Sequence, residues 1–298
     1  MTETTEMVSG TVPARARTPQ RRTLAPRLRR IAAAAAWWVA SVALFTGLWE
    51  LAWAMGWAPQ LLLPPPHIFL TNFVQQAQYF DTAKIGQAQA APLVAVLTTI
   101  LATVLRVLAG LAMGFVVSLV TGVLITQSRV VRGLVLPTLT LLAPISPVAW
   151  LPVSIFLFGI GNGPAVFMVF VGVYFVMTLA TVSQINAVSG TYLDVARTMG
   201  ANRRQMLRQV VLPSILPGLL QTLRMNLFAA WMVVLLAEAV GVGSGLGQVI
   251  MLARNTFNAS LVFFAMTLIG LTGYLLDLMF RALQGRLLWW QSASKGAV

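Results

Sequence analysis

Long apolar stretches separated by short polar ones run through most of the chain. The apolar runs lie at about residues 31–57, 99–126, 133–158, 164–187, 214–240 and 260–283. Each run is close to or above the ~20 residues that a helix needs to cross a bilayer. The pattern predicts an all-α integral membrane protein with about six transmembrane helices. Residues 1–30 are polar and basic, which predicts a disordered tail ahead of a membrane domain over residues 31–298.

Prolines interrupt the third of these runs. The segment "LLAPISPVAWLP" places Pro144, Pro147 and Pro152 inside an apolar stretch. Each proline removes a backbone N–H donor and bends a helix. We therefore expect the third span to be bent.

Small residues recur at four-residue spacing in the second run, at Gly110, Gly114, Ser118 and Gly122. Small side chains let two membrane helices approach closely. This row predicts a tight helix contact in preference to a ligand site.

The segment between the first two runs, "LLLPPPHIFLTNFVQQAQYF", predicts a proline turn followed by an amphipathic helix. Its apolar face contains Ile68, Phe69, Phe73, Ala77 and Phe80. Such a helix is typical of the membrane–water interface, here on the external side of the membrane. The single histidine of the chain, His67, precedes it, and we interpret it as a loop residue because one imidazole without neighbouring carboxylates cannot hold a metal ion.

The charge of the chain is strongly positive but unevenly distributed. The protein has 298 residues, of which 58% are hydrophobic and 9% charged, and its net charge is +13. If the Arg-rich tail lies in the cytoplasm and six spans alternate, most of the 20 Lys and Arg residues fall on the cytoplasmic side. We therefore expect a multi-pass protein of the bacterial plasma (inner) membrane with both termini in the cytoplasm. The basic residues indicate orientation, not nucleic-acid binding.

Several kinds of chemistry are excluded by composition. The chain has no cysteine, so disulfides and thiolate sites are absent. A phosphate-binding loop of the G-x-x-x-x-G-K-[ST] type needs a lysine after glycine, and the only lysines are Lys84 and Lys295, in "TAKIG" and "ASKGA". Isolated carboxylates give no nucleophile and base pair. The sequence predicts no catalytic residue, no metal site and no ATP hydrolysis by this chain.

A polar interruption, "TYLDVARTMGANRRQMLRQVVLP", lies between the fourth and fifth runs on the predicted cytoplasmic side. Thr191 with Asp194 predicts a capping box for a helix from Tyr192 to Met199, and Gly200 occupies the position of a left-handed C-terminal cap. Asn202 with Gln205 predicts a second capped helix, which we expect to run to Leu212 before Pro213.

The first of these short helices has a narrow apolar ridge. Leu193, Ala196 and Met199 follow one another at three-residue spacing, flanked by Asp194 and Arg197. A free helix of about eight residues is unstable in water, so it must dock on something. The residues alone leave open whether it docks on the protein's own spans or on another protein.

The same loop resembles the EAA loop of ABC importer permeases. The family pattern is E-A-A, three residues, G, nine residues and I-x-L-P, and this chain has it as Asp194, Val195, Ala196, Gly200, Val210, Leu212 and Pro213. Further segments resemble the branch for sulfonates, taurine, nitrate and similar solutes, and the resemblance covers about residues 37–290. These segments are "WEL" at 49–51, "LLPPP" at 62–66, "LRVLAG" at 105–110, "FGIG" at 158–161, "AE" at 237–238 and "SGLG" at 244–247.

The resemblance implies a homodimer in the membrane, two cytoplasmic ATPase subunits that bind ATP and Mg, and an external solute-binding protein. It also implies that the coupling loop, residues 189–213, carries a coupling helix that sits in a cleft of the ATPase. The implied ATPase-coupling residues are Leu193, Asp194, Ala196, Arg197, Met199 and Gly200, and the implied supporting residues are Val210, Leu212 and Pro213. Movement of the coupling helices would switch the spans between inward-facing and outward-facing states.

Charged residues within the predicted spans need a reason, because a charge at mid-bilayer costs on the order of 3 kcal/mol. Arg224 lies close to the predicted midplane, where it either faces the translocation pathway of an anion or is bonded within the protein. Arg106 and Glu238 lie at similar depth and are candidates for a structural ion pair. Asp277 and Arg281, four residues apart, are candidates for a local pair.

The sequence thus predicts the permease subunit of an ATP-driven importer for a small solute. An anion such as an aliphatic sulfonate, taurine, nitrate or bicarbonate fits the resembled branch and Arg224. The alternatives are an importer of the same class that carries a vitamin precursor, and a secondary transporter or channel that works without ATP. An enzyme ranks last, because no catalytic constellation exists.

Overall fold

The computed structural model describes residues 24–57, 59, 63–80 and 91–289, and these residues form helices and connecting turns without a strand. The longest helices are α1 (Leu24–Ala54), α4 (Pro92–Gln127), α7 (Asn162–Asn186), α10 (Leu212–Ala237) and α12 (Ala259–Leu287). Shorter ones connect them: α2 (Pro66–Thr71), α3 (Phe73–Ala77), α5 (Arg129–Leu142), α6 (Leu151–Phe158), α8 (Gly190–Thr198), α9 (Arg203–Gln205) and α11 (Leu246–Asn255). The prediction of an all-α membrane protein is confirmed.

Four helical segments in the described part of the chain are long and apolar enough to cross a membrane. They are Pro92–Gln127, Asn162–Asn186, Arg203–Val242 and Ala259–Leu287. A fifth crossing exists if α5 and the segment Pro147–Phe158 are one broken span. The count of six stays a prediction, since it requires both this bent pair and α1 to cross. Because α1 begins at Leu24, the tail predicted over residues 1–30 is helical in its last residues, and residues 1–23 lie outside the described part.

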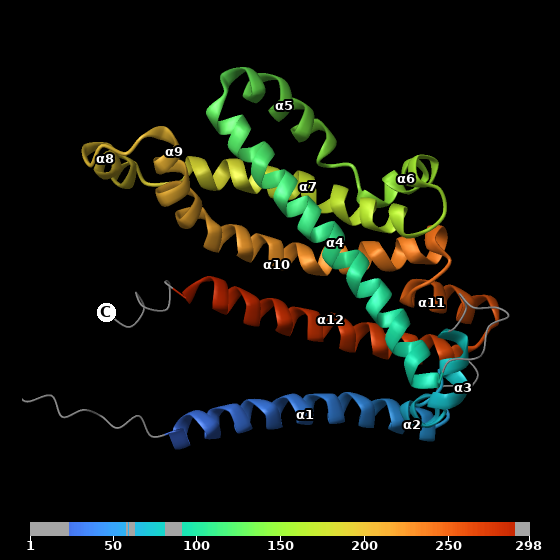
Figure 1. Cartoon of the computed structure of the whole chain (residues 1–298). Coiled ribbons are helices and arrows are strands. Elements are labelled where there is room, and N and C mark those ends of the chain that lie inside the picture. Colours follow the sequence, from blue (N-terminus) through green and yellow to red (C-terminus); the bar gives the residue numbers. More distant parts are fainter. Residues whose placement is uncertain (1–23, 58, 60–62, 81–90, 290–298) are drawn as a thin grey trace, which may run out of the picture.

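The elements are arranged with the short connecting helices at two opposite ends of the bundle. Figure 1 shows α8 and α9 at the left, on the side where α1 begins and α12 ends, while α2, α3, α6 and α11 lie at the right. In the same view α4 runs diagonally across α7, and α10 and α12 lie alongside. Buried side chains from α4, α7, α10, α11 and α12 make one apolar core.

The row of small residues on α4 is the place where α4 and α7 meet. A Cβ atom added to Gly110 would lie 2.5 Å from Val169 Cβ, and one added to Gly114 would lie 2.9 Å from Val173 Cβ. Gly122 makes the same close approach to Thr181. Side chains larger than hydrogen would force the helices apart, so the predicted tight contact is confirmed.

The predicted bend in the third run is confirmed. Helix α5 ends at Leu142, a turn of 3₁₀ helix follows over Pro147–Trp150, and α6 begins at Leu151. The two parts differ in direction by 100°. Pro147 and Pro152 each lie in the first turn of a helical segment. A backbone N–H at that position would have no intrahelical acceptor, so proline breaks no hydrogen bond there.

The segment before α4 differs from the single interfacial helix that its pattern predicts. It forms α2, α3 and a 3₁₀ turn over Gln78–Phe80. Its apolar face packs on the protein, because Phe69, Ala77 and Phe80 are buried and the two phenylalanines contact Phe263 and Phe264 of α12.

His67 is also placed differently from its predicted loop. It is the second residue of α2, and its Nδ1 lies 2.9 Å from Glu50 Oε1, so a carboxylate does neighbour it. The described residues contain no cluster of three or more His, Cys, Asp or Glu that could hold a metal ion.

Candidate functional site

Three parts of the molecule carry charged or polar groups in positions that need explanation: the α8–α9 element, a buried network at the opposite end, and two sites on α10. The α8–α9 element turns sharply at Gly200, whose φ of 80° is in the left-handed region predicted for it. Asn202 and Gln205 make the predicted capping box, with reciprocal bonds of 2.9 Å between each side chain and the other residue's backbone N–H. The predicted elbow between two short helices is confirmed.

Two details of this element correct the sequence prediction. Thr191 and Asp194 form no capping box, because α8 begins earlier with Ser189 as its N-cap, and Asp194 instead bonds to Arg197 at 2.8 Å. The second helix also does not stop before Pro213. From Met206 to Val211 it has π-helical bonding and then continues as α10, with Pro213 in the first turn of α10, where proline is tolerated.

The three residues of the predicted apolar ridge lie on two different faces of α8. Ala196 is 8% exposed and Leu193 is half-buried against the protein's own core, so both lie on the inner side. Met199 points outward, together with Tyr192 and Val195, at exposed fractions of 82%, 62% and 53%. The outward apolar face therefore consists of Tyr192, Val195 and Met199. The three-residue spacing groups Met199 with Leu193 and Ala196, which lie on the inner side.

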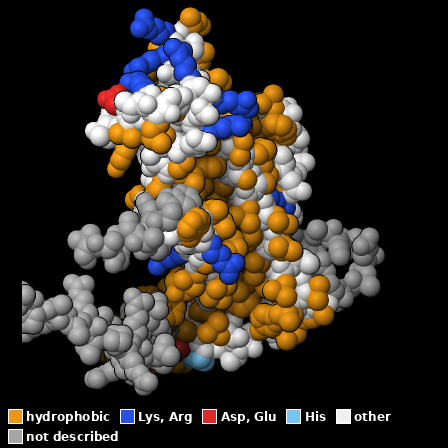
Figure 2. Space-filling view, turned by 60° about the vertical axis from the view of Figure 1, so that its left-hand side comes forward, with side chains coloured by type: hydrophobic (Ala, Val, Ile, Leu, Met, Phe, Trp, Pro, Cys, Tyr) orange, Lys and Arg blue, Asp and Glu red, His pale blue; other side chains and the backbone are white. Residues whose placement is uncertain are grey.

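The surface around this element is rich in charged groups, whereas the surface of the spans is mostly apolar (Figure 2). Figure 2 shows Lys and Arg side chains gathered at the upper end of one face, above a broad hydrophobic surface. The exposed side chains of α8 include the Asp194–Arg197 pair. An apolar face bordered by charged groups at the end of a membrane domain is typical of a site for a soluble protein.

A buried polar network lies at the opposite end of the bundle. Arg106, on α4, is 6% exposed and forms an ion pair with Glu238 at the end of α10. Its Nε donates to Asn162 Oδ1 at 2.9 Å, and Nη2 donates to Ser244 Oγ at 2.8 Å. The two residues that the sequence suggested as partners thus form the centre of a larger network.

Glu238 is fully buried and completes the network with three further groups. Its Oε2 accepts a hydrogen bond from Thr103 Oγ1 and one from the backbone N–H of Gly247, each at 3.0 Å. The backbone N–H of Leu246 donates to Thr103 Oγ1 at 3.1 Å. The network therefore joins α4, α7, the π-helical end of α10 and α11, and each charge has the partners that burial requires. Thr103, Asn162 and Ser244 were not found from the sequence, since a polar residue near a span end carries no pairing signal.

Arg224 is bonded within the protein. Its Nε and Nη2 donate to the two carboxylate oxygens of Asp277, at 2.7 and 3.2 Å. Asp277 also accepts from Arg281 at 2.8 Å, as the four-residue spacing predicts. Sequence reasoning missed the bond from Arg224 to Asp277, because it links two helices and only tertiary packing brings them together.

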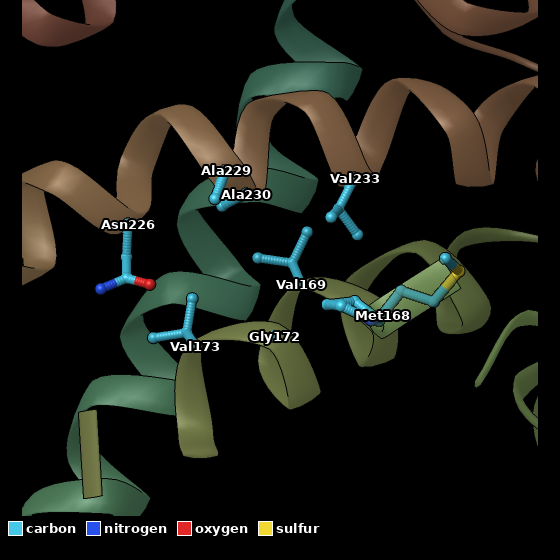
Figure 3. A pocket seen from close by; sticks show the side chains of 9 residues that line it. Met168, Val169, Gly172, Val173, Asn226, Ala229, Ala230 and Val233 are labelled. Carbon is cyan, nitrogen blue, oxygen red and sulfur yellow. The ribbon is translucent and has the colours of Figure 1, made fainter. Parts of the chain in front are cut away.

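A small pocket lies between the middles of α7 and α10 (Figure 3). Its lining is apolar except for one amide, and its cavity volume is about 30 Å³. Figure 3 shows Asn226 at one side, with valines and Met168 around the rest. The residues that line it include Pro147, Met168, Gly172, Asn226, Ala229 and Val233.

Comparison with known proteins assigns this architecture to a family. The family model described as "Binding-protein-dependent transport system inner membrane component" matches residues 110–289. The chain belongs to this family. The taurine transport system permease protein TauC of Escherichia coli (strain K12) is 30% identical over 250 residues, which are 83% of this chain and 86% of TauC. The bicarbonate transport system permease protein CmpB of Synechococcus elongatus is 28% identical over 59% of this chain and 64% of its own length.

A solved structure shows the same fold. The methionine ABC transporter MetNI, in an inward-facing conformation, contains a chain that superposes with a TM-score of 0.56 at 22% identity, covering 66% of this chain and 98% of that one. The family and its relatives, and not this fold likeness, make the protein a permease subunit of an ABC importer in the inner membrane, with ATP hydrolysis in a partner ATPase.

Proposed function

We propose that this permease works as a homodimer which, driven by two cytoplasmic ATPase subunits, moves a small anion delivered by an external binding protein. In this proposal ATP and Mg are bound by the ATPase, and the permease itself binds no cofactor. The observation that carries the proposal is the outward apolar face of α8, which protrudes at one end of the bundle and which the described residues of the chain leave exposed (Figure 1).

The α8 helix has the features of a docking element. It is only nine residues long, and on its other face Ala196 is buried and Leu193 packs against the core, so its orientation is fixed before any partner binds. Aromatic and methionine side chains such as Tyr192 and Met199 are enriched at protein interfaces. We infer that Tyr192, Val195 and Met199 enter a cleft of the ATPase, and that Asp194 and Arg197 contact its edge.

The link from α8 to the spans suits the transmission of movement. Gly200 makes one sharp turn, and from Arg203 onward the helical segment continues without a break to Val242. A displacement of α8 by the ATPase would therefore be passed to α10 through this continuous helical segment. Val210, Leu212 and Pro213 lie where the π-helical stretch passes into α10, which fits a supporting role.

The proposed solute class follows from the relatives. TauC is named for taurine and CmpB for bicarbonate, and both solutes are small and carry an anionic group. We propose that this chain carries a solute of that size and charge, with aliphatic sulfonates, taurine, nitrate and bicarbonate as the candidates to test.

The ATPase contact can be tested by crosslinking, because the chain has no cysteine of its own. Single-cysteine variants Val195→Cys and Met199→Cys should crosslink to the ATPase in membranes that contain the assembled complex. Ala196→Cys, one residue from Val195 but 8% exposed, is the matched control and should crosslink weakly. Failure of both outward positions to crosslink to any ATPase would contradict the proposal.

A further inference from the structure

The pocket between α7 and α10 suggests which chemical class of solute passes through the membrane domain. We propose that this pocket receives the aliphatic part of the solute while Asn226 contacts its polar group, so that the solute is a short aliphatic anion such as an alkanesulfonate, not an inorganic anion. This inference rests on the proposed function and specifies its substrate.

The pocket lies where a transport site is expected along the spans. Gly172 is about 15 Å of helix rise from the start of α7 and about 21 Å from its end, so the pocket is near mid-membrane. Substrate sites of transporters commonly lie near the midplane, beside broken helices. Pro147, which begins the second half of the bent pair α5–α6, forms part of the wall.

The pocket adjoins a face of α10 that the described part of the chain leaves exposed. Met225 and Met232 are each 69% exposed, and Phe228 is 52% exposed. Ala229, which lines the pocket, is also exposed. A solute moving along this face of α10 would therefore pass the mouth of the pocket.

Asn226 has hydrogen-bonding capacity left for a solute. Its Nδ2 donates one bond, of 2.9 Å, to the carbonyl of Thr222, so a second N–H and the Oδ1 oxygen remain. The remaining N–H can donate to a sulfonate or carboxylate oxygen. Since the amide is uncharged, such a bond holds an anion less firmly than a guanidinium would, which suits a site that must release its solute.

Arg224 does not supply this contact in the present conformation. It is bonded to Asp277 on α12, and a separation of two residues places Arg224 and Asn226 on different faces of α10. Asn226 is thus the one polar side chain among the residues that line the pocket.

The composition of the pocket discriminates between the candidate anions. Bicarbonate and nitrate expose polar atoms on all sides, and next to Met168, Gly172 and Val233 they would lose hydration without replacement. An alkanesulfonate can place its hydrocarbon end on these residues and its oxygens near Asn226. Because the cavity is only about 30 Å³, it fits the end of a short chain and not a whole solute.

The test is ATP-dependent uptake into proteoliposomes that contain the full-length permease, its cognate ATPase and its cognate binding protein. The labelled probes are ethanesulfonate, butanesulfonate, bicarbonate and nitrate. Wild-type protein should take up an alkanesulfonate. Asn226→Leu should lower that uptake about tenfold or more, as expected for losing a hydrogen bond to a charged group. Ala229→Leu, which fills the pocket, should lower it similarly, with a larger loss for butanesulfonate than for ethanesulfonate.

Gln221→Leu is the matched control for Asn226→Leu, because Gln221 is an exposed amide on the same helix outside the pocket. Gln221→Leu should leave uptake unchanged. Asn226→Gln, which keeps an amide, should retain part of the uptake that Asn226→Leu loses. Size-exclusion profiles verify folding, and Ala229→Val replaces Ala229→Leu if the larger side chain prevents assembly. Uptake of bicarbonate or nitrate without any alkanesulfonate, or wild-type uptake by both pocket variants, would overturn the inference. The cysteine crosslinks test the importer assembly separately, so the two failures are distinguishable.

Discussion

The buried pair Arg106–Glu238 allows the most demanding test of the structure. Removing either charge alone, as in Arg106→Gln or Glu238→Gln, leaves the other charge buried without its ionic partner. Glu238 also accepts bonds from Thr103 and Gly247, so its replacement disturbs α4 and α11 together. Breaking a buried pair in this way costs about 3–5 kcal/mol of the free energy of unfolding.

The double variant Arg106→Gln/Glu238→Gln removes both charges, so its cost should fall below the sum of the two single costs by about 1–3 kcal/mol. Exchange of the two residues, Arg106→Glu with Glu238→Arg, should not restore stability. The reason is that the Thr103 hydroxyl and the Gly247 N–H would then donate toward a guanidinium, which accepts no hydrogen bonds.

The measurement is the free energy of unfolding from SDS titration of the purified permease in mixed micelles. Arg254→Gln is the control, since Arg254 is exposed and its guanidinium makes only a long contact of 3.8 Å to the Met251 sulfur among the described residues, so the change should be within about 0.5 kcal/mol. Additive single costs, or full recovery of stability in the exchanged variant, would show that the buried network does not hold these elements together.

Three further predictions concern helix contacts, the elbow and the second charged pair. Gly110→Ala should lower the free energy of unfolding by about 1–3 kcal/mol, because the added methyl group forces α4 away from α7. Gly133→Ala is the control, since a Cβ at Gly133 meets nothing within 4 Å, and it should be neutral or slightly stabilising in the same titration. Gly200→Ala should cost about 1–2 kcal/mol from its positive φ and should reduce co-purification of the ATPase. Asp277→Asn should lower the yield of folded protein, because Arg224 loses its carboxylate partner. The double variant Arg224→Gln/Asp277→Asn should recover the yield and keep near-normal uptake. Loss of uptake in the double variant would instead assign Arg224 to the translocation pathway.

Features that depend on local chemistry were predictable from the sequence. The bend at Pro147, the close contact at Gly110 and the left-handed turn at Gly200 each follow from what proline or glycine does to its own backbone. The Asn202–Gln205 capping box is likewise a contact within one turn. In each case the residues that make the feature are neighbours in the chain or on one helix face.

Features that depend on how the helices pack against one another were predicted less well. The spacing of Leu193, Ala196 and Met199 indicated one ridge, but docking of α8 on the core separates Met199 from the other two. Similarly, Asp277 bonds to its own-helix neighbour Arg281 and also to Arg224 on α10, and only the second bond depends on tertiary packing. A periodic pattern gives the faces of a helix but not the identity of what covers each face.

The positions of these features along α10 connect them physically. The segment Arg203–Val242 begins beside the α8–α9 elbow and ends in the π-helical turn where Glu238 is bonded to Arg106. Between these ends lie the Arg224–Asp277 pair and Asn226 in the mid-span pocket. Because the segment has no break, a force applied at α8 under the proposed function would reach both the pocket and the buried network. The network would then resist sliding of α10 against α4 and favour a tilt about the Glu238 end of α10. Such a tilt would move the side chains at mid-span more than those near Glu238.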